Sequence, residues 1–372
     1  MEKAGLYVHF PFCRAKCPYC HFASRSYDRG SALAWAAGVL KEAEAAAGLG
    51  LRFDTLYFGG GTPSLIDPDE LVPLIDGLRE RLRLEPLEFT LEANPSTRIG
   101  PGSFSGLSRA GVTRLSVGVQ SFDDAVLGVL GREATAAEAE RYVAQAADSS
   151  GFSLGLDLMA GAPGEAQAGL EKTLEAVSRL RPDHVSVYLL ENVEGLPFEA
   201  ILREHPVEDD AAADAFEFLA RGLASLGLRR YEISNFARPG FECRHNLKYW
   251  RYEPFLGLGP SAASHIGAER WTNADRLEDW LAGLEAGCDP RREIVRLEPE
   301  ASAREAMAAG LRLVEGVDLA ALERRFGIDF AATTGAAIAR LKEDGLLAGE
   351  GSRIWIPEER LLVSNAILAR LI

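Results

Sequence analysis

The sequence predicts an α/β protein in which a partial (β/α)6 barrel is followed by a smaller α+β module of the winged-helix type. Strand-like apolar runs alternate with helix-like runs from residue 6 to about residue 235. Such a series forms a parallel sheet, because each helix returns the chain right-handedly to the next strand. Polar residues or glycines follow one predicted strand after another. From residue 299 onward, helices precede two short strands that a glycine-rich turn separates.

The predicted barrel elements follow in a regular order. The first strand covers the apolar residues 6–10 and ends at Pro11. The first helix covers the alanine-rich residues 31–47. The second begins at Asp67 and Pro68, because Asp is a good N-cap and Pro suits the first helical turn. The other predicted strands are 55–58, 87–91, 114–119, 154–158, 184–190 and 230–233, and the other predicted helices are 136–147, 165–180 and 209–226.

Composition limits the class of protein. The chain has 372 residues, enough for one large domain and a smaller one, and a formal net charge of −15. That charge disfavours broad binding to nucleic acid or to an anionic membrane. We expect no membrane span, because no run of about twenty apolar residues occurs, and no targeting segment precedes the first strand. Clustered cysteines in a non-secreted chain indicate metal binding rather than disulfides, and such free thiols fit a reducing compartment. We therefore expect a cytoplasmic protein.

Cys13, Cys17 and Cys20 follow the first predicted strand with the spacing C-x3-C-x2-C. Four thiolates would satisfy every iron of a cubane iron–sulfur cluster, whereas three hold the cluster and leave one iron open to a small molecule. A zinc site normally uses four protein ligands, and no second pair of ligands follows downstream. Incidental cysteines or a disulfide would not explain three cysteines within eight residues. The spacing therefore favours an iron–sulfur cluster.

Residues at the ends of the predicted strands should meet at one end of the barrel, where the chemistry of such folds collects. The second strand opens into residues 59–62 (Gly-Gly-Gly-Thr), whose backbone is free to approach a ligand closely. No Gly-Lys-Ser/Thr follows, so this segment is not a P-loop. Glu92, Gln120 and Asp157 stand at or near the ends of the third, fourth and fifth strands. A polar residue at the end of one strand is ordinary at the rim of a barrel, but polar residues or glycines at the ends of five successive strands predict a pocket.

A second cluster of chemically capable residues is the segment 243–250, Cys-Arg-His-Asn-Leu-Lys-Tyr-Trp. His245 is a natural axial ligand to haem iron, and Tyr249 and Trp250 offer aromatic surface for a macrocycle. The alternative is a loop whose His and Trp pack against the barrel mouth. Cys243 stands close enough to be another ligand, but a small buried apolar role is favoured.

The C-terminal part is predicted to contain helices at 303–313, 319–326, 331–343 and 359–372, with a hairpin ending at 354–356. Winged helices often bind DNA, but acidic residues accompany the arginines here and no basic stripe occurs. We therefore favour a packing or lid role without nucleic acid. The predicted organisation is a barrel over 1–235, a connecting region over 236–298 and the winged-helix-like domain over 299–372.

The cysteine segment resembles the radical S-adenosylmethionine (SAM) superfamily, whose signature is this spacing with an aromatic residue, here Tyr19, before the last cysteine. The lead-in from Tyr7 through His9 to Cys13 (Tyr-x-His-x-Pro-Phe-Cys) narrows the resemblance to the branch of coproporphyrinogen oxidases and haem chaperones. The resemblance covers essentially the whole chain. It implies a radical SAM barrel with a [4Fe–4S] cluster on the three cysteines. It also implies a SAM site lined by Tyr7, Tyr19, Gly60, Gly61, Thr62, Glu92, Gln120, Arg132 and Asp157.

Residues 245–250 resemble the His-Asn-x-x-Tyr-Trp motif of the haem chaperone branch, which is associated there with haem binding. This implies that His245, Tyr249 and Trp250 contact haem. Phe22 stands where the oxidases carry a further cysteine, and only a few residues precede Tyr7 where the oxidases carry a long extension. Both departures favour a haem chaperone that delivers haem to acceptor haemoproteins such as respiratory enzymes.

The alternative function is that of an oxygen-independent coproporphyrinogen III oxidase, acting through a 5′-deoxyadenosyl radical. Whether SAM is cleaved, and whether the chain forms a homodimer, is left open. The sequence also departs from the haem chaperone branch. His21 stands where an acidic residue is common, and Ala160 and Ala162 replace an aromatic residue and a leucine. Ala263 occupies a position that often holds a histidine, although His265 follows two places on.

Overall fold

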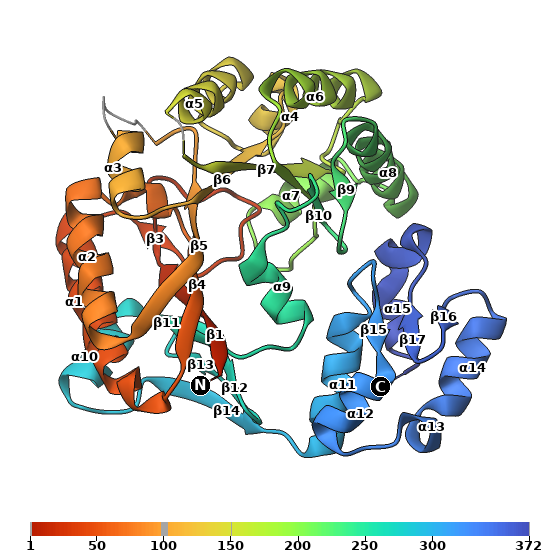
Figure 1. Ribbon diagram of the computed structural model, residues 1–372. Coiled ribbons are helices and arrows are strands. Elements are labelled where there is room, and N and C mark those ends of the chain that lie inside the picture. The colour runs from red at the N-terminus through yellow and green to blue at the C-terminus, as the bar shows by residue number, and fades with distance from the viewer. Residues whose placement is uncertain (1, 98–102, 150, 372) are drawn as a thin grey trace.

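The computed structural model describes residues 2–97, 103–149 and 151–371. Within them lies a twelve-stranded sheet with the strand order β14-β13-β12-β11-β1-β4-β5-β6-β7-β8-β10-β9. Six neighbouring strands in its middle run parallel and curve around an interior (Figure 1). This confirms the predicted partial six-stranded barrel. The six strands are β1 (Lys3–Phe10), β4 (Arg52–Gly60), β5 (Arg83–Ala93), β6 (Arg114–Gln120), β7 (Ser153–Ala160) and β8 (His184–Leu189).

Most helices between these strands cover the outside of the curved sheet (Figure 1). As predicted, Asp67 caps α2, because its side chain accepts a hydrogen bond from the backbone N–H of Asp69. Thr135 and Glu138 cap α5 reciprocally. The helices of this part are α1 (Arg29–Ala46), α2 (Pro68–Arg81), α3 (Ser103–Arg109), α4 (Asp124–Val129), α5 (Ala136–Asp148), α6 (Gln167–Leu180), α7 (Phe198–Glu204) and α8 (Asp209–Ser225), with the 3-10 turns η1 (Ala47–Leu49) and η2 (Pro63–Leu65).

The main apolar core lies between the sheet and the outer helices. Trp35 of α1 is 1% exposed and packs edge-on against Phe58 of β4. Successive side chains of a strand point to opposite faces of the sheet. Because Leu56 and Phe58 face this core, Thr55 and Tyr57 point into the barrel interior. The same alternation along the other strands gives the interior its polar lining.

One predicted barrel strand is wrong. Instead of a strand over residues 230–233, the chain forms β9 (Arg229–Arg230) and β10 (Asn235–Ala237), and β10 pairs antiparallel with β8. The Arg230 guanidinium donates hydrogen bonds to the carbonyls of Glu232 and Ile233. These bonds stabilise a turn between the two short strands, so the series of parallel strands stops at β8.

The region predicted as a connection contributes strands to the same sheet. β11 (Phe255–Leu258) runs parallel to β1, and β12 (Ala263–Ile266), β13 (Glu269–Asn273) and β14 (Arg291–Arg296) extend the sheet antiparallel. Helix α10 (Leu277–Glu285) packs beside α1. Helix α9 (Arg244–Trp250) lies within the curve of the barrel (Figure 1). The domain limits at 235 and 298 stay a prediction.

The C-terminal part has its own apolar core around Met307 and Phe330 and a three-stranded sheet. The predicted last helix is wrong in form: it is a 3-10 turn, η3 (Glu358–Val363), followed by the short α15 (Ser364–Leu368), and Ile372 lies outside the described residues. This tighter winding is typical of short pieces and keeps Leu361 buried. The other elements are α11 (Pro299–Gly310), β15 (Val317–Asp318), α12 (Leu319–Phe326), α13 (Phe330–Thr333), α14 (Gly335–Glu343), β16 (Ala348–Glu350) and β17 (Arg353–Trp355). Among the described helices, none is long and apolar enough to cross a membrane.

Candidate functional site

The cysteine segment forms a loop that is closed at its base. Strand β2 (Phe12–Cys13) pairs with β3 (Arg25–Ser26), and the backbone N–H of Tyr27 donates to the carbonyl of Cys13 at 2.9 Å. Cys17 and Cys20 lie between these strands, linked by a hydrogen bond from the N–H of Cys20 to the carbonyl of Cys17. All three cysteine side chains are half-buried, and none of them forms a disulfide. The loop therefore presents three thiols from one short stretch of chain.

These thiols line a cavity of about 450 Å3, which we call the cysteine cavity. Its volume lies within the usual range for small-molecule sites. The cavity brings together residues from the loop and from the ends of β4, β5, β6 and β7, as the strand-end argument predicts. Of the positions predicted for the cluster and SAM, it is lined by Cys13, Cys17, Cys20, Tyr19, Gly60, Gly61, Thr62, Glu92, Gln120, Arg132 and Asp157. Tyr7 alone among them does not line it.

The glycine segment packs directly against the cysteine loop. A Cβ atom on Gly61 would lie 2.3 Å from the carbonyl oxygen of Phe12, a separation that real Cβ atoms do not adopt. The N–H groups of Gly61 and Thr62 donate to the carbonyls of Phe10 and Phe12. The Thr62 hydroxyl stands 3.6 Å from the Cys13 sulfur. Glycine is needed here because two backbone segments approach closely.

Two half-buried carboxyl groups face the cavity, and neither forms an ion pair among the described residues. Glu92 accepts hydrogen bonds from the Tyr57 hydroxyl at 2.8 Å and from the Gly60 N–H at 3.1 Å. Burial raises the pKa of Glu92 to about 7. Asp157 accepts from the Ser116 hydroxyl at 3.1 Å, and burial also raises its pKa. Carboxyl groups in this state suit hydroxyl or ammonium groups of a ligand.

Two basic residues among the described lining, Lys16 and Arg132, face this cavity, and the Arg132 guanidinium is held on three sides. It donates to the Cys17 sulfur at 3.3 Å, to the Asn94 side-chain oxygen at 3.1 Å and to the Gly118 carbonyl. Asn94 was missed by the sequence argument, although it follows Glu92 by two residues at the same strand end. Gln120 has a φ of 73°, a strained conformation for a residue other than glycine, and such strain clusters at functional sites.

The residues present fit a cluster of the cubane type. Three thiols from one loop face one cavity, and the Arg132 guanidinium contacts Cys17. Across the described residues, no group of three Cys, His, Asp or Glu side chains is gathered as for a single metal ion. A cubane has four iron corners, so its thiolates stand around a larger object. When bound, such a cluster supplies one-electron chemistry and one iron without a protein ligand.

A second cavity of about 550 Å3 lies beside the first. Phe22, Gly60, Glu92, Tyr188 and others line both, so the two cavities share a wall. We call the second one the aromatic cavity, because much of its lining is aromatic. Its far side belongs to the C-terminal part of the chain. The aromatic lining residues are Tyr7, Phe22, Tyr57, Tyr188, Phe216, Tyr249 and Trp250, and the C-terminal ones are Arg312, Leu362, Ser364 and Asn365.

Tyr7 lines the aromatic cavity and not the cysteine cavity, and its contact with SAM stays a prediction. It points into the barrel from the middle of β1, and its hydroxyl bonds His9 Nδ1 at 3.1 Å. His9 Nε2 in turn bonds the carbonyl of Ala23 at 2.8 Å, which ties the end of the cysteine loop to β1. Burial lowers the pKa of His9, so the ring is neutral in this role. Tyr7 thus supports the cysteine loop through His9.

The structure engages both ring nitrogens of His245. Nδ1 lies 2.9 Å from the Thr55 hydroxyl, and Nε2 lies 2.8 Å from the Tyr249 hydroxyl. The side chain is fully buried, stacks on Tyr57 and has its pKa lowered by burial to about 3. Iron could bind His245 only after one of these hydroxyls moved. The expected haem contacts Tyr249 and Trp250 both line the aromatic cavity.

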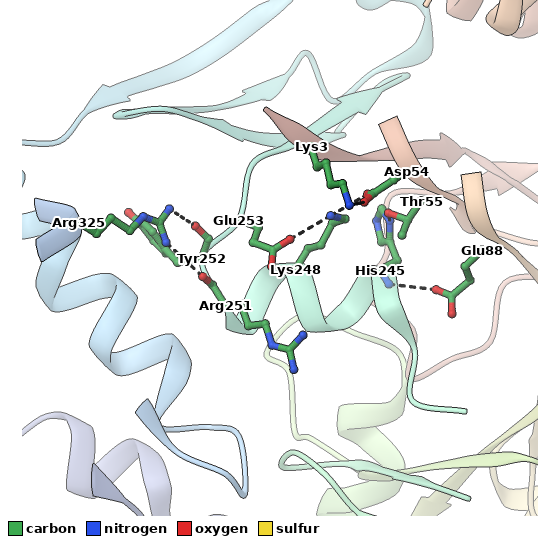
Figure 2. Close-up of polar contacts among 10 residues, drawn as sticks. All are labelled: Lys3, Asp54, Thr55, Glu88, His245, Lys248, Arg251, Tyr252, Glu253 and Arg325. Atoms are coloured by element: carbon green, nitrogen blue, oxygen red, sulfur yellow. Dashed lines mark hydrogen bonds and ion pairs between the residues drawn. The ribbon is translucent and has the colours of Figure 1, made fainter. Parts of the chain in front are cut away.

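Helix α9 is fixed to the barrel by buried polar contacts (Figure 2). Glu88 of β5 accepts from the backbone N–H of His245 at 3.0 Å. Lys248 pairs with Asp54 at 2.8 Å and with Glu253 at 3.0 Å, and its side chain is only 7% exposed. At the other end, Arg325 of α12 donates to the carbonyl of Tyr252. The helix is therefore held between the barrel and the C-terminal part.

Two of the departures noted in the sequence can be located. His21 is exposed, lines the cysteine cavity and stacks on Phe22. His265 lies on β12 against the ring of Tyr252, at a centroid distance of 4.3 Å, and lines neither cavity. It therefore does not replace a ligand-contacting histidine at position 263.

This fold, with three thiols at the mouth of a partial barrel, defines a radical SAM protein. The model of the radical SAM superfamily matches residues 7–177, and that of the HemN C-terminal domain matches residues 297–363. Membership in this superfamily confirms the predicted cofactors, a [4Fe–4S] cluster and SAM. Which residues contact them stays a prediction.

Within that superfamily, the chain belongs to the family of the heme chaperone HemW. It is 32% identical to the heme chaperone HemW of Mycobacterium tuberculosis (strain H37Rv), over 99% of this chain and 94% of that protein. It is 37% identical to the heme chaperone HemW of Escherichia coli (strain K12), over 70% of each chain. The fold matches the solved coproporphyrinogen III oxidase (HemN) from Escherichia coli, with a TM-score of 0.85, 23% identity, and coverage of 100% of this chain and 90% of that one.

Proposed function

We propose that this chain is a haem chaperone that binds haem in the aromatic cavity and delivers it to acceptor haemoproteins. The single observation that carries the proposal is an aromatic cavity of about 550 Å3 that shares a wall with the cysteine cavity. Apolar aromatic walls suit a porphyrin macrocycle. The relatives named heme chaperone HemW, matched over most of the chain, support the same conclusion.

In the cysteine cavity, Cys13, Cys17 and Cys20 would hold the [4Fe–4S] cluster. The glycine segment and Thr62 would approach SAM with their backbone. Glu92, Gln120 and Asp157 would accept hydrogen bonds from its hydroxyl and ammonium groups, and Tyr19 would border it. Arg132 places positive charge beside Cys17, which suits both a thiolate-bound cluster and the carboxylate of SAM.

In the aromatic cavity, Tyr249 and Trp250 would pack against the macrocycle. His245 would ligate the iron through Nε2 when the Tyr249 hydroxyl releases it. The test is a haem titration of anaerobically reconstituted protein. We expect His245→Ala to weaken haem binding at least tenfold and to shift the haem absorption band. Tyr249→Phe frees Nε2 and should retain or strengthen binding.

The matched control is His205→Ala, because His205 is exposed after α7 and lines neither cavity. It should bind haem like the wild type. Unchanged affinity in His245→Ala would remove His245 as the iron ligand. Wild-type protein that binds no haem would overturn the chaperone function itself.

The second candidate function is that of an oxygen-independent coproporphyrinogen III oxidase. The shared wall favours it, because a radical formed in the cysteine cavity would arise next to a porphyrinogen in the aromatic cavity. Phe22, at the position where we expect a cysteine in the oxidases, speaks against it. An anaerobic assay with reductant, SAM and coproporphyrinogen separates the two functions: steady conversion to protoporphyrinogen would establish the oxidase.

We also infer a cytoplasmic location, acceptors among respiratory haemoproteins, and a homodimer as one state of the chain. These inferences rest on the family and on the clustered thiols, which need a reducing compartment. Mass measurement of the reconstituted protein with and without SAM tests the homodimer. Transfer of labelled haem to a haem-free respiratory enzyme tests the acceptor class.

A further inference from the structure

Arg312 is the one Lys or Arg side chain among the described residues that line the aromatic cavity. It follows α11 and stands where the C-terminal part meets the barrel. An antiparallel β-bridge between Glu232 and Leu313, together with the hydrogen bond from the Val314 N–H to the Tyr231 carbonyl, fixes the backbone there. The position of Arg312 on the cavity wall is therefore set by backbone contacts between the barrel and the C-terminal part.

Among the described residues, the Arg312 guanidinium makes no direct ion pair, and the carboxyl of Glu232 acts on it only at longer range. Its guanidinium donates to the Asn365 side-chain oxygen at 2.9 Å and lies 5.6 Å from the centre of the Trp250 ring. Among the described residues, no Asp or Glu oxygen lies within 4 Å of it. Burial lowers the pKa of Arg312, whereas the guanidinium of Arg270 on the same part of the chain pairs with Glu305. A half-buried cation without a direct ion pair attracts an anion.

A second donor stands beside it without a partner. The indole N–H of Trp250 is buried and makes no hydrogen bond within the described residues, although Trp250 lines the cavity. Buried polar groups in proteins are nearly always hydrogen-bonded, so such a donor points to a missing acceptor. On the facing side, Glu232 is 1% exposed and its Oε1 also lacks a partner. Burial raises the pKa of the Glu232 carboxyl group.

We propose that Arg312 and the Trp250 indole N–H bind a propionate carboxylate of haem at the seam between the barrel and the C-terminal part. This inference rests on the proposed function. The propionates are the anionic groups of an otherwise apolar macrocycle, and a guanidinium binds a carboxylate through paired, charge-assisted hydrogen bonds. Haem would then lie with its propionate edge toward α11, α15 and the Trp250 end of α9, and with its other edge toward the cysteine cavity. The C-terminal part would thereby select carboxylate-bearing porphyrins.

The test compares two ligands and three variants of the full, reconstituted chain under anaerobic conditions. The ligands are haem and haem dimethyl ester, which has no free carboxylate. Arg312→Gln should weaken haem binding roughly 10- to 100-fold, as expected for a lost charged hydrogen bond, and should change ester binding less than about twofold. Arg312→Lys keeps the charge and should recover part of the loss. The matched control is Arg304→Gln on α11, whose partner is the surface residue Glu300.

Each outcome decides the inference. A selective loss for haem supports it. An equal loss for both porphyrins would mean that Arg312 acts only by packing the C-terminal part against the barrel through Asn365. No loss for either porphyrin would mean that Arg312 does not contact the ligand. Either result overturns the inference, while the haem chaperone function stands. Wild-type protein that binds neither porphyrin overturns the proposed function and the carboxylate site together. A melting temperature for each variant, measured without porphyrin, separates lost folding from lost binding.

Discussion

The two cavities share a wall but are completed in different ways. In the cysteine cavity, Arg132 already has three acceptors, and Glu92 already has two donors. In the aromatic cavity, Arg312 has no carboxylate partner within the described residues, and the Trp250 indole N–H has no acceptor. The first arrangement suits a resident group that stays bound. The second leaves polar groups to be satisfied by a molecule that arrives and leaves, as a chaperone's cargo does.

The largest expected effect comes from removing a thiol of the cysteine cavity. Cys20→Ala should abolish the cluster, because three thiolates are the fewest that hold a cubane. Iron and sulfide content after anaerobic reconstitution measures it. Exposed Cys288 gives the matched control, Cys288→Ala, which should keep the full cluster. If Cys20→Ala binds haem within threefold of the wild-type affinity, the two cavities bind their ligands separately. A full cluster in Cys20→Ala would contradict the assignment of the cluster to the cysteine cavity.

The second prediction concerns the support of the aromatic cavity. The buried carboxylate of Asp54 pairs with Lys248 at 2.8 Å and with the exposed Lys3 at 3.9 Å. Lys248→Met removes the nearer partner and should lower the free energy of unfolding by about 3 kcal/mol. Haem affinity should fall because α9 loses its anchor, whereas cluster content should stay. Chemical denaturation and haem titration measure the two effects. Lys172→Met is the control, because Lys172 pairs with Asp123 on the surface. This change should lower the free energy of unfolding by less than about 1 kcal/mol. Equal losses would contradict the anchoring role.

The third prediction tests the close contact behind the cysteine cavity. Gly61→Ala places a methyl group 2.3 Å from the Phe12 carbonyl and should cost about 2 kcal/mol. The cysteine loop should shift, so cluster content should fall as well. Gly128→Ala in α4 meets nothing within 4 Å and should stabilise the chain by about 0.5 kcal/mol. If Gly61→Ala were as stable as Gly128→Ala and kept its cluster, the close packing of the two loops would be refuted.

The smallest effect lies on the shared wall. Burial raises the pKa of Glu92 to about 7, above its value of about 4.5 in the unfolded chain. The folded protein therefore binds the proton more tightly, and this group makes the free energy of unfolding fall as pH rises from about 4.5 to about 7. The full shift corresponds to about 2.5 kcal/mol between pH 5 and pH 8. Because the Glu92 side chain is only half-buried, solvent screening reduces this, and Glu92→Gln should remove about 1 kcal/mol of the decrease. Denaturation at both pH values checks this, and Glu42→Gln, at another buried carboxyl with a pKa of about 7, is the comparison. If the free energy of unfolding of Glu92→Gln falls with pH as much as that of the wild type, the raised pKa of Glu92 is refuted.

The cysteine cavity was predictable because its residues follow rules that are local in sequence. Three thiols lie within eight residues, and Glu92, Gln120 and Asp157 stand at strand ends, which a parallel sheet brings to one edge. The strand-end argument does not cover Tyr7, because this residue lies in the middle of β1 and points inward, toward the aromatic cavity. The predicted strand after residue 230 is absent, because the Arg230 side chain donates hydrogen bonds to the carbonyls of Glu232 and Ile233 and stabilises a turn there.

The aromatic cavity was predictable only in part. Tyr249 and Trp250 carry a recognisable motif, but Tyr57 and Tyr188 are single inward positions of apolar strands, and only the alternation along each strand could have singled them out. Arg312 could not have been found, because its role depends on how the C-terminal part meets the barrel. Nor does the sequence show that both nitrogens of His245 are engaged, as that depends on Thr55 of a distant strand.

The central claim is that haem lies in the aromatic cavity while the cluster occupies the cavity next to it. The most direct measurement is the anomalous scattering of iron from crystals of the haem-loaded, reconstituted chain. We expect one strong peak beside Cys13, Cys17 and Cys20 and a second, single-iron peak in the aromatic cavity next to His245. A haem iron located on the outer surface of the barrel, with the aromatic cavity empty, would contradict the account.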